Sequence, residues 1–99
     1  MITVFDTNVV IDALNRVELV DMKYNRYERV LISRITWIEV LIGAEEDDSE
    51  LRDFLGTGFE IIPLDLAVAE TAVQLRREYR VGLPDAISWA TAKRVQRRL

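Results

Sequence analysis

The sequence contains no cysteine and no histidine among its 99 residues. Without cysteine there is no disulfide framework, no thiol nucleophile and no thiolate metal site. Without histidine there is no Ser-His-Asp or Cys-His triad, no imidazole acid–base catalysis and no ordinary zinc site. Any chemistry must therefore come from carboxylates, hydroxyls, lysine or arginine, and carboxylate oxygens suit Mg²⁺ or Mn²⁺.

Long apolar runs and a secretory start are also missing. No run approaches the roughly 20 residues of a membrane span, and residues 1–6 lack the basic segment of a signal peptide and meet an acid early. The apolar share of 49% and the charged share of 30% are ordinary for one soluble globular domain. We therefore expect a single domain over residues 1–99, located in the cytoplasm and without membrane contact.

Charge is distributed unevenly along the chain. The net charge is −4, but residues 1–70 carry 15 acids and 6 bases, whereas residues 71–99 carry 2 acids and 7 bases. An acidic site beside a basic flank fits a polyanion held near a metal ion. The alternative is that two solvated helices are simply rich in arginine.

Apolar runs and helical spacings alternate along the chain. Strands are expected at 2–5, 30–32 and 59–62. Helices are expected at 7–15, 17–24, 34–44, 49–55, 66–80 and 84–97, with a turn at 56–58. Apolar strands that alternate with helices imply a parallel sheet with helices on both faces, which is an α/β fold.

Helix caps and breakers mark several of these boundaries. Ser33 and Asp65 are expected to cap the helices that follow them, and Asp6 or Thr7 to cap the first helix. Gly82 is expected to break the helix before it, and Pro84 suits the start of the last helix.

The binding crevice of such a fold lies beyond the carboxyl ends of the strands, which selects Asp6 after the first strand, Ser33 after the second and Asp65 after the third. Three acids stand out as candidate site residues. Asp6 is one, Glu39 is the only charge in the apolar segment 35–42 of the helix after Ser33, and Asp85 opens the last helix. Each has a structural alternative: a helix cap for Asp6, an exposed helix stripe for Glu39, and a favourable macrodipole interaction for Asp85.

Three segments, taken together, resemble the PIN domain. They are residues 5–12 (FDTNVVID), 33–40 (SRITWIEV) and 83–92 (LPDAISWATA). In particular they are similar to the toxin of bacterial VapBC toxin–antitoxin pairs, in order and spacing, over residues 1 to about 95. The resemblance implies a three-layer α/β/α fold and an endoribonuclease that depends on Mg²⁺ or Mn²⁺. It also implies an RNA substrate and a VapB-like antitoxin as partner.

The resemblance also implies roles for individual residues. The catalytic and metal-holding acids are Asp6, Glu39 and Asp85, whose carboxylates we expect to converge within about one coordination sphere. Polar residues of the same motifs would support them: Thr7, Asn8, Thr36 and Ser88. Basic residues of the last two helices could contact RNA phosphates: Arg76, Arg77, Arg80, Lys93 and Arg94.

The sequence departs from the family pattern at its C-terminal end. Family members usually continue into a fourth strand that carries a fourth acid and lies beside the first strand, whereas this sequence stops at Leu99. We therefore expect an uncovered edge on the strand at 2–5, covered by a homodimer, a swapped element or a bound partner. One alternative is a catalytically incomplete PIN remnant that binds an antitoxin or dimerises. Another is a phosphate-receiving or nucleotide-binding domain, although residues 56–58 (GTG) lack the Lys-Ser/Thr of a phosphate loop.

Overall fold

The computed structural model describes residues 2–16 and 29–97, so the helix expected at 17–24 lies outside the described residues. Its elements follow one another as β1 (Ile2–Phe5), α1 (Thr7–Arg16), β2 (Arg29–Ser33), α3 (Arg34–Ile42), α4 (Ser49–Gly58), β3 (Glu60–Ile62), α5 (Leu66–Tyr79) and α6 (Leu83–Arg97). None of the helices in this described part is long and apolar enough to cross a membrane.

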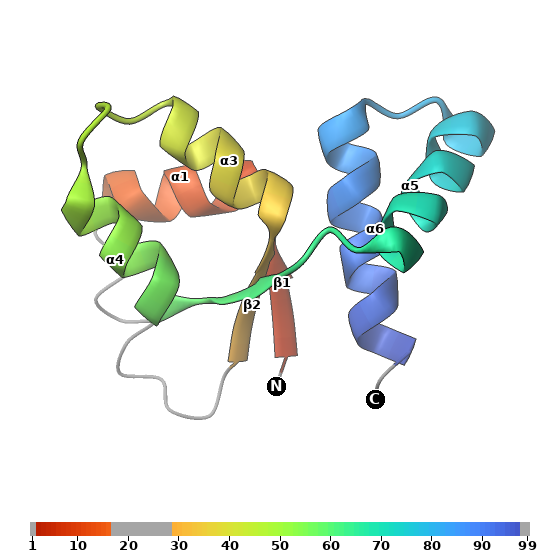
Figure 1. Cartoon of the computed structure of the whole chain (residues 1–99), viewed down its shortest axis with the longest axis horizontal. Helices are drawn as coiled ribbons and strands as arrows, with labels where there is room; N and C mark the ends of the chain where they lie inside the picture. Colours follow the sequence, from red (N-terminus) through yellow and green to blue (C-terminus); the bar gives the residue numbers. More distant parts are fainter. Residues whose placement is uncertain (1, 17–28, 98–99) are drawn as a thin grey trace.

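The strands form a parallel sheet in the order β1-β2-β3, with Val4 opposite Leu31 and Ile32 opposite Ile61. In Figure 1 the strands lie between α1, α3 and α4 on one side and α5 and α6 on the other. This arrangement confirms the predicted three-layer α/β fold. Because all strands run the same way, their carboxyl ends meet at one edge of the sheet, from which α1 and α3 start (Figure 1).

Two apolar cores hold the helices in place. One joins the sheet to α1, α3 and α4 and contains the fully buried side chains of Val10, Ile32 and Leu55. The other lies between α5 and α6, where small side chains such as Ala72 and Ala86 are buried, so the two helices pack closely. The second core fixes α6, and with it the start of that helix, beside the carboxyl edge of the sheet.

The helix α4 runs through Gly58, so the turn expected at 56–58 was wrong and the third strand is shorter than expected. Tertiary packing explains the extension. The Phe54 ring meets the Phe59 ring edge-on with centroids 5.7 Å apart. A Cβ added at Gly58 would lie 3.3 Å from Phe54, so glycine leaves room for that ring over the last turn.

The helix ends differ in detail from the sequence-based boundaries. Ser33 and Asp65 cap α3 and α5 as predicted, each accepting a backbone N–H three residues on. The helix α5 ends at Tyr79, within one residue of the expected end, and Arg80 caps it with a left-handed φ of 55°. Gly43 ends α3 two residues early, and α6 starts one residue early, at Leu83.

Candidate functional site

A pocket of about 260 Å³ lies where β1 ends and α6 begins. Its lining comes from segments far apart in the sequence: Asp6, Thr7, Asn8, Glu39, Pro84, Asp85 and Ser88. The fold thus brings the three acids singled out in the sequence, and three of the four supporting residues, to one place. The fourth, Thr36, is fully buried behind the pocket and contacts Thr7.

Asp6 leaves β1 at the point where α1 starts, and its side chain is exposed. Its Oδ1 accepts a hydrogen bond of 2.9 Å from the backbone N–H of Val9. This is the bond of an N-terminal helix cap, so the structural alternative for Asp6 is real. The same bond also fixes the direction of the carboxylate at the pocket wall, so capping and lining the pocket are compatible.

Glu39 is turned toward α1. Thr7 Oγ1 donates a 2.6 Å hydrogen bond to Glu39 Oε1, and it has a longer contact of 3.4 Å with Thr36 Oγ1. A hydroxyl–carboxylate bond of this length is charge-assisted and strong. Glu39 is half-buried, so it is not simply part of a solvated helix stripe.

Buried hydroxyls extend this contact behind the pocket. Ser33 Oγ donates to Thr36 Oγ1 at 3.2 Å and lies 3.5 Å from Ser88 Oγ on α6. The hydroxyls therefore connect α1, β2, α3 and α6 around the acids. The sequence predicted Ser33 as a helix cap and, from its position at the carboxyl end of the second strand, as a residue beside the crevice of the parallel sheet. Its contact with Ser88 of α6 could not be read from that position.

Asp85 lies in the first turn of α6 and is exposed. The buried side chains of Ala86 and Ala90 face the core, which directs Asp85 to the opposite, open side of the helix. An acid at this position is favoured by the helix macrodipole. The same position makes Asp85 part of the lining that Thr7 and Asn8 of α1 also form.

The carboxylates do not converge as tightly as expected. Within residues 2–16 and 29–97, no group of three carboxylates lies close enough to share one metal ion. Local bonds explain the difference, because Asp6 binds the Val9 N–H and Glu39 binds the Thr7 hydroxyl. The donor set nevertheless fits a hard cation, since Mg²⁺ keeps several waters and takes only one or two carboxylates.

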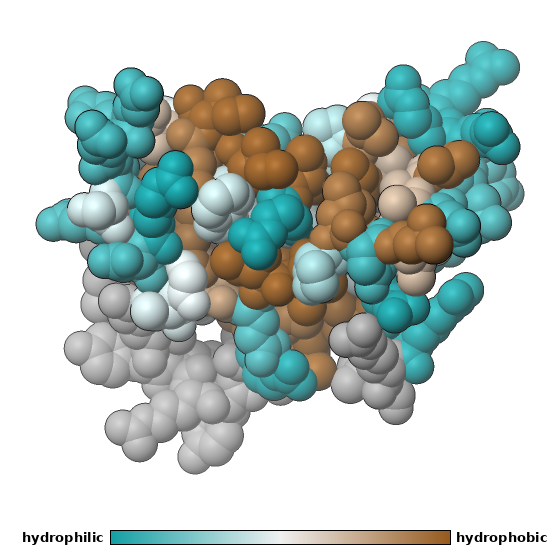
Figure 2. Space-filling view, in the orientation of Figure 1, coloured by the Kyte–Doolittle hydropathy of each residue, from teal (hydrophilic) through white to brown (hydrophobic). Residues whose placement is uncertain are grey.

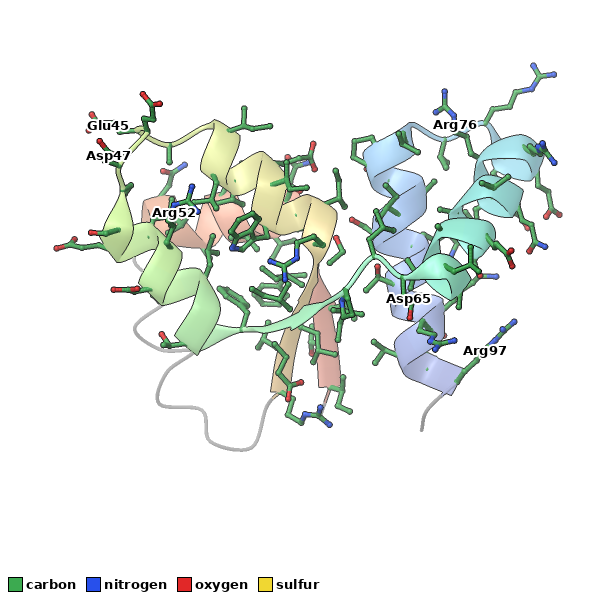
Figure 3. All side chains as sticks on the ribbon, in the orientation of Figure 1. Glu45, Asp47, Arg52, Asp65, Arg76 and Arg97 are labelled. Atoms are coloured by element: carbon green, nitrogen blue, oxygen red, sulfur yellow. The ribbon has the colours of Figure 1, made fainter. Side chains whose placement is uncertain are left out.

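The basic residues singled out in the sequence do not line this pocket. Lys93 and Arg94 line a groove between α5 and α6, where Arg94 Nη2 lies 3.7 Å from Asp65 Oδ2. Arg76 donates to the carbonyl of Val81 at the far end of α5. Figure 3 shows Arg76 there, and Glu45 and Asp47 on the loop before α4 on the opposite side of the molecule.

The fold and the pocket define an α/β protein with carboxylates gathered at the carboxyl ends of parallel strands. Residues 3–99 match the PIN domain, and the chain belongs to this family.

Two solved structures are similar to the chain. A chain of a toxin–antitoxin complex from Klebsiella pneumoniae is 36% identical, with a TM-score of 0.75; the match covers 95% of this chain and 80% of that one. A chain of VapBC2 from Rickettsia felis, bound to a DNA fragment from its promoter, is 22% identical, with a TM-score of 0.70 and coverage of 93% and 80%. No curated protein matches the sequence.

Proposed function

We propose that the chain is a divalent-metal-dependent endoribonuclease of the PIN type, the toxin of a toxin–antitoxin pair. PIN domains are generally nucleases. The observation that carries the proposal is the pocket that collects Asp6, Glu39 and Asp85 from three distant segments. The toxin role is supported by the 36% identity to a chain of a toxin–antitoxin complex.

The pocket residues would have separate roles in phosphodiester hydrolysis. When bound, Mg²⁺ or Mn²⁺ would polarise the phosphodiester and make a bound water more acidic. Asp6 and Asp85, which both line the pocket, would hold the cation. Glu39, oriented by Thr7, would accept a hydrogen bond from the attacking water or complete the cation's ligands. The Asn8 amide and the Ser88 hydroxyl would orient a phosphate oxygen.

The experiment that tests this function is RNA cleavage with Mg²⁺ or Mn²⁺. Asp6→Asn keeps an oxygen for the Val9 cap but loses the charge, and Asp85→Asn likewise removes only charge. Both variants should lose cleavage, because a neutral amide holds a hard cation poorly. The matched control is Asp47→Asn, on the exposed loop far from the pocket (Figure 3), which should cleave as the wild type does. Equal cleavage by wild type and Asp6→Asn would refute the assignment of Asp6.

A second candidate function is a catalytically incomplete PIN domain that binds an antitoxin or dimerises. It is favoured by the absence, in the described part of the chain, of three carboxylates close enough to share an ion. Calorimetry with Mn²⁺ separates the two. Binding that Asp85→Asn abolishes supports the enzyme, and no binding at millimolar Mn²⁺ supports the incomplete domain.

For the antitoxin, we propose that a segment pairs with β1. Among the described strands β1 is an outer strand of the sheet, and the unpaired backbone groups of an outer strand are a template for another strand. The acidic pocket lies where β1 ends, so an antitoxin bound along β1 would also obstruct the pocket. Amide hydrogen exchange of residues 2–5 should slow when a cognate antitoxin is added. Unchanged exchange in a formed complex would place the antitoxin elsewhere.

We also propose a homodimer, formed through an apolar hollow of about 580 Å³ between the segment before α5, α5 itself and the start of α6. Leu64, Val73 and Leu83 line it, and each is at least 43% exposed. Figure 2 shows apolar side chains at the surface over α5 and α6. Burying such side chains in a self-complementary interface is favourable. A toxin that cleaves RNA must act where RNA is made and translated, so we propose that the protein acts in the cytoplasm.

A further inference from the structure

A second hollow, of about 330 Å³, continues the acidic pocket toward Trp89 on α6. The two cavities share Asp6, Asp85 and Ser88 in their linings. The wall of the second hollow away from the acids is apolar and is made by Val4, Val9, Trp89 and Ala92. A ligand whose charged part occupied the acidic pocket would therefore meet an apolar, aromatic surface with its neighbouring part.

Trp89 packs against a neighbouring ring but remains partly exposed to solvent. It is 38% exposed, and its ring packs against Tyr79 of α5 with centroids 4.9 Å apart and planes tilted by 47°. The ammonium of Lys93, one turn further along α6, lies 5.6 Å from the ring centroid. The Trp89 ring thus has an aromatic neighbour, Tyr79, and a cation, Lys93, which also lines the groove between α5 and α6.

The second tryptophan of the chain provides a contrast. Trp37 is half-buried, and the guanidinium groups of Arg34 and Arg52 lie over its ring at 5.0 and 5.6 Å. It packs against the main core and lines neither the acidic pocket nor the hollow beside it. The combination of exposure, an adjacent cation and access to the acidic pocket therefore belongs to Trp89.

We propose that Trp89 is a base-stacking platform for single-stranded RNA. It would stack the base of the nucleotide that neighbours the phosphate held in the acidic pocket, while Lys93 moves off the ring to contact a phosphate of the same strand. Stacking on exposed aromatic rings beside basic side chains is how proteins hold single strands without reading much sequence. The inference rests on the proposed function for the identity of the ligand, and it adds a residue that positions the substrate.

Tryptophan fluorescence tests the contact directly. Trp37→Phe leaves Trp89 as the single tryptophan and serves as the parent protein. A single-stranded RNA, titrated in Ca²⁺ and shown by gel to stay intact, should quench the Trp89 emission to saturation. In the natural background Trp89→Ala should weaken RNA binding about 5- to 150-fold, the range of one base–aromatic stack. Trp89→Phe should keep most of the affinity, and Trp37→Phe all of it.

Removing bases from the RNA locates the stack. Each position of the oligonucleotide is replaced in turn by an abasic nucleotide, and binding is measured with wild type and Trp89→Ala. At one position the abasic change should weaken wild-type binding but leave Trp89→Ala binding unaltered, because the stack is already lost. Circular dichroism of Trp89→Ala confirms that the variant is folded.

The outcomes separate the stacking site from the nuclease. Cleavage by wild type without any position that couples to Trp89 would overturn the stacking site and leave the nuclease standing. Coupling at one position without cleavage would support the stacking site and remove the catalytic part of the proposal. Absence of RNA binding by the wild type would overturn the stacking site as well.

Discussion

At the scale of single residues, the hydrogen bond between Thr7 and Glu39 joins α1 to α3 at the pocket, across 32 positions of sequence. A residue that orients a metal-binding side chain typically changes metal affinity 10- to 100-fold when it is lost. We predict that Thr7→Val, which keeps the shape and loses the hydroxyl, weakens Mn²⁺ binding by about 10- to 100-fold.

Calorimetric titration with Mn²⁺ measures this effect. Thr7→Ser restores the hydroxyl and should restore most of the affinity, which separates the hydrogen bond from the packing of the methyl group. If Thr7→Val bound Mn²⁺ as tightly as the wild type, the hydrogen bond from Thr7 would not be what positions Glu39 for the metal ion.

At the scale of elements, α5 depends on its N-terminal cap. Asp65 Oδ1 accepts the Val68 N–H at 2.9 Å, and Oδ2 lies 3.7 Å from Arg94 on α6. We predict that Asp65→Ala lowers the free energy of unfolding by about 1–2 kcal/mol, most of it from the cap, since a partly exposed ion pair contributes only about 0–1 kcal/mol.

Urea denaturation separates these two contributions. Asp65→Asn keeps a capping oxygen and loses the charge, so it should be less than about 1 kcal/mol below the wild type. A loss from Asp65→Asn as large as that from Asp65→Ala would show that the ion pair with Arg94, and not the cap, stabilises α5.

Helix boundaries that depend on neighbouring residues could be predicted from the sequence, whereas one that depends on packing could not. The caps at Ser33 and Asp65 were predicted correctly because each is set by a residue and its neighbour three positions on. The extension of α4 through Gly58 was missed because glycine locally favours a turn, whereas in the structure the Phe54 and Phe59 rings pack against each other in the core beside Gly58.

At the scale of the whole molecule, the apolar hollow at Leu64, Val73 and Leu83 decides the oligomeric state in our proposal. We predict that Val73→Glu converts the homodimer to a monomer, because a charge buried in an apolar interface is costly. Val73 is exposed in the single chain, so the variant should fold normally.

Sedimentation velocity measures the dimer. The matched control is Leu66→Glu, on the same helix, which is 74% exposed but does not line the hollow. It should remain dimeric. A wild type that sediments as a monomer at micromolar concentration would refute the dimer, and a Val73→Glu dimer would place the interface on another surface.

The sequence by itself determined the alternation of strands and helices, the parallel sheet and the three acids of the candidate site. Side-chain periods of about 2 and 3.6 and the residues at helix ends are local properties, and parallel strands necessarily share one carboxyl edge. The absence of histidine and cysteine likewise limited the chemistry to oxygen ligands before any contact was known.

Only the tertiary structure decided which groups meet. It turned Glu39 toward Thr7, joined the buried Ser33 hydroxyl to Ser88, and kept the carboxylates of the pocket apart in the described residues. It also placed Lys93 and Arg94 in the groove between α5 and α6, outside the acidic pocket. Which of these groups meet depends on how α6 packs against α5 and the sheet. Packing between distant segments cannot be read from the local periodicity of the sequence.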